Sequence, residues 1–183
     1  MKTFLVLLCS AFYVSGSLAQ NPFTNKAQGK IAELKKATQH PLIIEAVSKQ
    51  NQQKRSLASI QEMDEKWKNA SGEPAFIKTF LSNPCAKHLK EVKKTFTYVA
   101  ELFVMDNQGA IVCESDKTSD YWQGDEAKWK ESFNKGQGKD FFDQPKFDES
   151  TQAFLMQISY PIFDAQKHTI GAITVGIDLD KLK

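Results

Sequence analysis

The first part of the chain carries apolar residues at helical spacing. Ala27, Ile31 and Leu34 are separated by four and three residues, and the same spacing resumes after Pro41. Proline fits the first position of a helix, where its missing N–H would have no partner. No glycine or proline interrupts residues 42–69, so the pattern predicts one long helix there, with apolar ends and a polar middle.

Two shorter helices are predicted next. Residues 74–81 carry apolar side chains at helical spacing. Asn83 followed by Pro84 is typical of an N-cap and a first helical position, which predicts a further helix as far as about Lys94.

From residue 97 onward the pattern changes to the alternation and composition of strands. A turn ending at Gly109 separates two alternating runs and predicts a hairpin. Two later runs are rich in β-branched and aromatic residues, which suits central strands joined by a turn at Asp164 to His168. The predicted strands cover residues 98–105, 110–115, 139–142, 152–163 and 169–179, with a helix over residues 125–134.

This order predicts an α+β fold with a helical part over residues 24–95 and a five-stranded antiparallel sheet over residues 97–180. In the strand at residues 152–163, alternation places Phe154, Met156, Ile158, Tyr160 and Ile162 on one face. The other face takes Leu155, Gln157, Ser159 and Pro161. The pattern does not say which face meets the long helix.

Residues 1–19 have the organisation of a signal peptide. Lys2 precedes an apolar run from Phe4 to Val14, and small residues at Ser17 and Ala19 suit a signal peptidase. Cleavage after Ala19 would leave residues 20–183 as a single domain. No second apolar segment is long enough to cross a membrane, so we expect a periplasmic or secreted protein without membrane insertion.

Composition excludes some partners and suggests one covalent link. The 24 basic and 22 acidic residues nearly balance, which gives no field to attract nucleic acid or an anionic membrane. Cys85 and Cys113 remain after signal cleavage, and an even pair in an oxidising compartment predicts a disulfide. Two buried, inert thiols are the alternative.

The richest candidate chemistry lies in residues 118–129, TSDYWQGDEAKW. Aromatic side chains can form flat walls or face a cation, while a carboxylate would suit an amine and an ammonium an acid. Candidate ligand-binding residues here are Tyr121, Trp122, Asp125, Lys128 and Trp129. Alternatively, Trp129 belongs to the buried stripe of the following helix, with Asp125 near its N-terminus.

The final hairpin adds Tyr160 and Asp164 as polar candidates, although Asp164 also suits a turn. The carboxylates of residues 116–126 lack the spacing of an EF-hand, and no two histidines have zinc-ligand spacing, so no metal is expected. No catalytic constellation, phosphate loop or dinucleotide fingerprint occurs. We therefore expect neither an enzyme nor a cofactor.

Four stretches, in this order, resemble the extracytoplasmic Cache sensor domains of the PDC type, which have a PAS-like fold. The stretches are HPLIIEAVSKQN, ELFVMDNQGAIVCES, SDYWQGDEAKW and SYPIFDAQKHTIGAITVGIDLDKL. The resemblance implies a long helix across one face of an antiparallel sheet, with a ligand pocket on the other face under the connection between the second and third strands. It also implies binding of a small polar solute: an organic acid, an amino acid or an amine.

Two departures from the family pattern shape the expected role. No transmembrane segment follows Lys183, so signalling to a membrane receptor or kinase partner in trans is expected. Lys128 stands beside Trp129 where amino-acid-sensing members place an arginine, and lysine lacks the planar guanidinium that binds a carboxylate through two parallel hydrogen bonds.

The alternative function is a structural or protein-interaction domain that has kept the sensor fold and lost its ligand.

Overall fold

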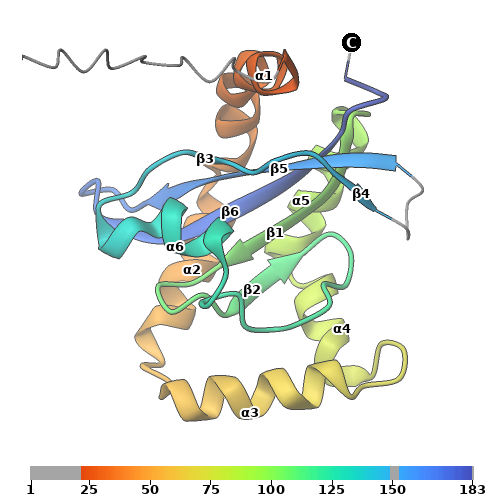
Figure 1. Ribbon diagram of the computed structural model, residues 1–183. Coiled ribbons are helices and arrows are strands. Elements are labelled where there is room, and N and C mark those ends of the chain that lie inside the picture. Colours follow the sequence, from red (N-terminus) through yellow and green to blue (C-terminus); the bar gives the residue numbers. More distant parts are fainter. Residues whose placement is uncertain (1–21, 149–152, 183) are drawn as a thin grey trace, which may run out of the picture.

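The computed structural model describes residues 22–148 and 153–182, and the predicted signal peptide lies outside them. Helices come first along the chain, and strands follow (Figure 1). The helices that precede the sheet are α1 (Pro22–Thr38), α2 (Pro41–Gln52), α3 (Leu57–Lys68), α4 (Ala75–Ser82) and α5 (Pro84–Thr95).

The sheet is antiparallel with the strand order β2-β1-β6-β5-β3, and β4 also pairs with β5. Helix α6 (Ala127–Phe133) and a short 3-10 turn (Asn134–Gly136) lie between β2 and β3. The strands are β1 (Val99–Met105), β2 (Ile111–Glu114), β3 (Phe141–Phe142), β4 (Lys146–Asp148), β5 (Ala153–Phe163) and β6 (Thr169–Asp178). The predicted α+β class and both hairpins are confirmed, whereas β4 was not predicted.

The prediction of one helix over residues 42–69 is wrong. The chain leaves the helix after Gln52, Lys54 adopts a positive φ of 49°, and a new helix begins at Leu57. The hydroxyl of Ser56 accepts the N–H of Ser59 and caps this new start. The polar middle has no apolar side chain to hold it against the core, so the break lets the two apolar ends pack in different directions.

Two other helix starts agree with the sequence. His40 and Asn83 are the N-caps of α2 and α5, and each precedes a proline at the first helical position. Their side chains accept backbone N–H groups of the first turn, at 3.3 Å for His40 and 2.8 Å for Asn83.

The face of the sheet that meets the helices is largely apolar. Helices α1, α2 and α5 pack here, and we call it the helix face. Strand register aligns Val104 with Ile173 and Tyr160, all of them buried. Met156, Ile158 and Ile162 are buried on this same face, so the predicted apolar face of β5 is the one that meets the helices.

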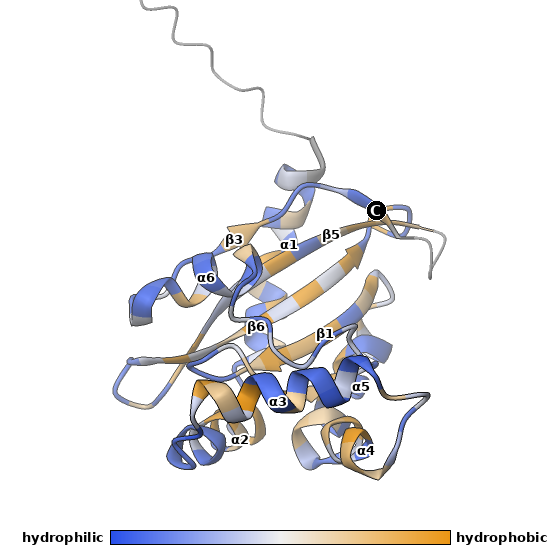
Figure 2. Ribbon diagram, turned by 60° about the horizontal axis from the view of Figure 1, so that its bottom comes forward, coloured by the Kyte–Doolittle hydropathy of each residue, from blue (hydrophilic) through white to orange (hydrophobic). Residues whose placement is uncertain are grey.

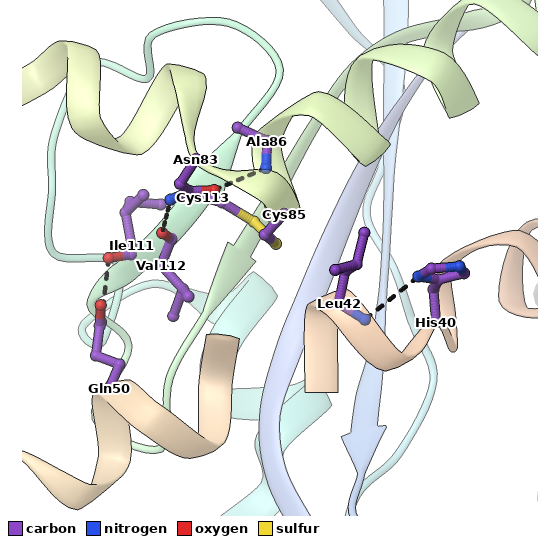
Figure 3. The surroundings of a disulfide bond; sticks show 9 residues. All are labelled: His40, Leu42, Gln50, Asn83, Cys85, Ala86, Ile111, Val112 and Cys113. Atoms are coloured by element: carbon purple, nitrogen blue, oxygen red, sulfur yellow. Dashed lines mark hydrogen bonds between the residues drawn. A yellow bond between two sulfur atoms is a disulfide. The ribbon is translucent and has the colours of Figure 1, made fainter. Parts of the chain in front are cut away.

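The predicted disulfide between Cys85 and Cys113 is present and joins α5 to β2 on the helix face, with a Cα–Cα distance of 5.9 Å (Figure 3). Helix α3 runs across the end of the molecule from α2 to α4 (Figures 1 and 2). Ile60 and Trp67 of α3 pack in a second apolar cluster, which also contains Phe103 and Tyr121. The opposite face of the sheet is covered by α6 and by residues 115–126, which we call the connection; this face is the connection face.

Candidate ligand-binding site

The connection face carries a row of polar side chains where an ordinary core would be apolar. Residues aligned on neighbouring strands share a face, and the register defines this row across four strands. The row consists of the polar residues Glu114, Thr174 and Ser159, with the apolar Phe103 between Glu114 and Thr174. Ser159 and Thr174 have no exposed surface, and their hydroxyl oxygens lie 2.8 Å apart. This bond uses one of the two hydroxyl protons. The other proton has no acceptor among the side chains and backbone groups of the described residues.

A second polar pair runs parallel to this row. Gln157 of β5 donates from its amide to Glu101 of β1 at 2.8 Å, across the intervening strand β6. Gly176 stands between them, and a Cβ there would lie only 2.5 Å from the Glu101 side chain. The glycine therefore makes the room in which the carboxylate lies flat on the sheet.

Glu114 is a fully buried carboxyl at the end of the row. One of its oxygens accepts the backbone N–H of Thr118 at 3.1 Å and the Thr118 hydroxyl at 2.9 Å, while the other oxygen, Oε1, has no partner. Burial raises the pKa of this carboxyl to about 7. A buried acceptor without a donor is costly and needs an explanation.

The connection supplies a second unpartnered acceptor. Gln123 is 1% exposed, and its amide nitrogen donates to the backbone oxygen of Asp120 at 3.0 Å and to its carboxylate at 2.9 Å. Its amide oxygen is buried and has no partner. Glu114 and Gln123 thus offer two oxygens that can accept hydrogen bonds from an ammonium, amide or hydroxyl group.

Lys128 brings a cation from α6 onto the same face. Its ammonium lies 5.3 Å from the centroid of the Phe103 ring and 3.0 Å from the carboxylate of Glu126. The side chain is only 15% exposed. Of the predicted ligand-binding residues, Lys128 is the one that the structure brings to the polar row.

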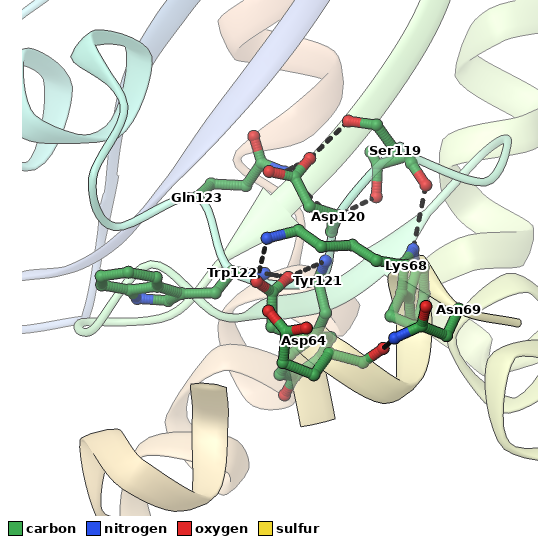
Figure 4. Close-up of polar contacts among 11 residues, drawn as sticks. Asp64, Lys68, Asn69, Ser119, Asp120, Tyr121, Trp122 and Gln123 are labelled. Atoms are coloured by element: carbon green, nitrogen blue, oxygen red, sulfur yellow. Dashed lines mark hydrogen bonds and ion pairs between the residues drawn. The ribbon is translucent and has the colours of Figure 1, made fainter. Parts of the chain in front are cut away.

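Helix α3 holds the connection in place through Asp64. One oxygen of this buried carboxylate accepts the backbone N–H groups of Tyr121 and Trp122 at 2.8 and 2.9 Å (Figure 4). The other oxygen lies 2.5 Å from the ammonium of Lys68. Asp64 therefore ties the connection to α3.

The Tyr121 side chain packs against helices α3 and α4. Its ring is fully buried against Trp67 and Phe80, with centroid distances of 5.6 and 5.4 Å, and Arg55 donates to its hydroxyl. Burial raises the pKa of Tyr121 to about 12. The tyrosine anchors the connection to α3 and α4.

Trp122 and Trp129 close the turn between β1 and β2. Their indole N–H groups donate to the backbone oxygens of Gln108 at 2.8 Å and Asp106 at 3.0 Å. Trp129 also stacks on Phe133 at 5.0 Å, the contact expected of a helical stripe. The backbones of the turn and of the connection also approach closely, since a Cβ on Gly109 would lie 2.4 Å from the Cα of Gly124.

The remaining predicted residues lie apart from one another. Asp125 is exposed at the start of α6. Tyr160 is buried on the helix face, where its hydroxyl oxygen lies 2.9 Å from that of Thr38. Asp164 accepts the backbone N–H groups of Gln166 and His168 and so organises the turn between β5 and β6. A ligand role for these three residues stays a prediction.

The sequence pattern did not single out Glu114, Gln123 or Thr174 as site residues. The available signal was the polar side of β5, where Gln157 and Ser159 alternate with large apolar residues. Within residues 22–148 and 153–182, no cluster of three or more histidine, cysteine or acidic side chains could hold a metal ion. No helix of the same residues has the length and apolar character needed to cross a membrane.

Comparison with known proteins gives one family match. Residues 68–183 match the family described as methyl-accepting chemotaxis protein-like, first PDC sensor domain. None of the curated proteins matches the sequence.

Several solved structures are similar at low sequence identity. The sensor domain of the V. cholerae histidine kinase DctB is 15% identical, with a TM-score of 0.49 over 87% of this chain and 53% of that one. The ligand-binding domain of the Campylobacter jejuni chemoreceptor Tlp3, in complex with 4-methylisoleucine, is 14% identical, with a TM-score of 0.43 over 87% and 61%. That of the Pseudomonas aeruginosa amino acid chemoreceptor PctC, in complex with GABA, is 13% identical, with a TM-score of 0.39 over 85% and 63%. This chain therefore spans between about half and two thirds of the structures that it resembles.

Proposed function

This chain belongs to the family of methyl-accepting chemotaxis protein-like PDC sensor domains, and from that premise we propose that it binds a small polar solute between the connection face and the connection. It acts as an extracytoplasmic sensor module, and solute binding changes a surface that a membrane receptor or kinase reads in trans. The disulfide between Cys85 and Cys113 supports a location in an oxidising compartment such as the periplasm.

The observation that carries this proposal is the contrast between the two faces of one sheet. The strands bury one hydroxyl on the helix face, that of Tyr160, which is paired with Thr38, whereas the connection face buries the hydroxyls of Ser159 and Thr174 and the carboxyl of Glu114. Polar groups in a core contribute less stability than apolar side chains of the same size. A binding site is the ordinary reason to keep such groups beneath a covering segment.

The chemistry of this face favours a solute with hydrogen-bond donors. Glu114 and Gln123 present unpartnered acceptor oxygens, and the one cation that we place on the row, Lys128, already lies beside Glu126. An amine, or the ammonium group of an amino acid, would satisfy these oxygens. A multiply charged organic acid would meet buried acceptors and a single, already paired ammonium, so it fits less well.

A route to a partner runs through α3. Asp64 ties this helix to the backbone of Tyr121 and Trp122. A solute that shifts the connection would therefore also shift the exposed side of α3, where a partner could bind. Two arrangements with different affinity for the solute are enough for such a signal.

A thermal-shift screen against amines, amino acids and carboxylic acids tests the proposal. At least one amine or amino acid should raise the melting temperature, because a solute that binds only the folded state stabilises it. In NMR titrations the hit should shift the backbone amide signals of Ser159, Thr174 and Gln123. Signals of Ile173, which points to the helix face, serve as the internal control. A screen without any stabilising solute, or a hit that maps only to the helices, would contradict the proposal.

The tight closure of the connection face favours a second function, protein interaction without a bound solute. Ser159 and Thr174 have no exposed surface, and Lys128 lies over Phe103. In this alternative the fold serves protein interaction and no solute enters. Binding of a partner protein together with a silent solute screen is the result that separates it from the sensor.

A further inference from the structure

A cavity of about 430 Å³ lies between α2 and the pair α4 and α5, away from the connection face. We call it the α2–α4 groove. Its volume falls within the range of small-molecule sites. Its apolar wall is formed by Ala46, Phe80, Val112 and the disulfide-bonded Cys85, which Figure 3 shows between α5 and β2.

Arg55, the single arginine of the sequence, lines this groove without an acidic partner. A guanidinium carries five N–H donors. Here one of its nitrogens, Nη2, donates to the neutral hydroxyl of Tyr121, and Nε is buried without a partner. The guanidinium also lies 5.6 Å from the centroid of the Tyr121 ring. Among the described residues, Arg55 forms no ion pair.

Lys49 adds a second cation to the groove. It lies on α2, is exposed, and forms no ion pair within the described part of the chain. Glu45, one turn earlier, also lines the groove and is paired with neither cation. The two cations outnumber the single acid, so the groove favours an anion.

We propose that the α2–α4 groove is a second binding site, which takes a small monocarboxylate with an apolar body. The carboxylate pairs with Arg55, because a guanidinium matches it with two parallel hydrogen bonds. The apolar body lies against Phe80 and Ala46. The site is separate from the connection face and does not depend on the function proposed for that face.

The link between Arg55 and Tyr121 gives occupancy of the groove a structural consequence. The carboxylate draws on the guanidinium that donates to Tyr121, and the backbone of Tyr121 belongs to the connection. Binding in the groove therefore perturbs the environment of Tyr121 and of Trp67 beside it. Tryptophan fluorescence and the Tyr121 ring signals report this change.

NMR titration of the whole chain with 3-phenylpropionate tests the proposal, with neutral 3-phenylpropionamide as the matched probe. The acid should give saturable shifts at Ala46, Phe80 and Val112, and the amide should bind at least about tenfold more weakly because it lacks the charge. Arg55→Gln should weaken the acid by a similar factor. Lys49→Glu, on an exposed helix position, should weaken it severalfold without affecting the fold. Lys130→Gln, an exposed lysine on α6, should leave the affinity unchanged.

Equal binding of the acid and the amide would overturn the proposal, as would an affinity that neither Arg55→Gln nor Lys49→Glu lowers. Shifts confined to the connection face would also overturn it. If Arg55→Gln lowers the melting temperature because the bond to Tyr121 is lost, Lys49→Glu still decides the outcome.

Discussion

Glu114 lies in an environment that is unusual for a carboxyl group, because it is fully buried. Burial raises the pKa of its carboxyl from 4.5 to about 7, so the folded protein keeps a proton that the unfolded chain releases. This stabilisation is complete below pH 4.5, declines as the pH rises and is lost above about pH 7. Across that window it amounts to at most roughly 3 kcal/mol in the free energy of unfolding.

Replacing Glu114 by glutamine should flatten this pH dependence. The amide keeps the shape of the side chain and an acceptor for Thr118, but it does not titrate. Denaturant unfolding at pH 5, 6, 7 and 8 measures the effect, with Glu131→Gln, an exposed position on α6, as the control. If the wild type and Glu114→Gln lose stability in parallel over this range, the carboxyl is not the group responsible.

Local chemistry explains which residues could be predicted from the sequence. Asn83 was identifiable as a cap because capping depends on a few consecutive residues. The cysteine pair was identifiable as a disulfide because of its number and the expected compartment. The burial of Glu114 depends on strand pairing with Phe103 and on the connection folding back over it. No local pattern contains that information, so Glu114 could not be predicted as a site residue from the sequence.

At the scale of elements, the break between α2 and α3 shapes the molecule most. The periodic residues on both sides of residues 53–56 suit a single helix, and no local breaker marks the gap. The break follows from packing, since α2 buries Ile43 and Val47 against the sheet while α3 buries Trp67 beside Tyr121. Sequence periodicity finds both helices, but it does not give the angle between them.

Asp64 should be the strongest tie between α3 and the connection. Asp64→Ala leaves the buried N–H of Tyr121 and the partly buried N–H of Trp122 without their acceptor, so it should cost about 2–3 kcal/mol of unfolding free energy. It should also speed hydrogen exchange in residues 119–124. Glu62→Gln, which removes a comparable but exposed pair with Lys66 on the same helix, should cost about 0.5 kcal/mol or less. Equal costs for the two variants would show that the connection is held by other contacts.

At the scale of the whole molecule, one sheet separates a structural face from a candidate binding face. The α+β class and the alternation within β5 could be predicted, because both follow from periodicity. Which face meets the helices could not, because each face of β5 contains both large apolar and polar residues. Only the assembled fold shows that Tyr160 belongs to the helix side and Ser159 to the connection side.

Apolar substitutions at Ser159 and Thr174 on the connection face should lower the affinity for the solute without lowering the stability of the fold. If Ser159 and Thr174 are kept for a solute, replacing both should not weaken the fold, because the partners of their mutual hydrogen bond are removed together. Ser159→Ala with Thr174→Val keeps the volume at both positions nearly constant. Ile173→Val, on the helix face of the same strand, provides the opposite control: it should cost about 1 kcal/mol of stability and leave solute affinity unchanged.

Calorimetric titration of the best solute from the screen into the wild type and into the Ser159→Ala/Thr174→Val variant tests whether the connection face binds the solute. The double variant should melt at the same temperature or higher and bind the solute at least about tenfold more weakly. Equal affinity for the two proteins would contradict the claim that the connection face is the binding site.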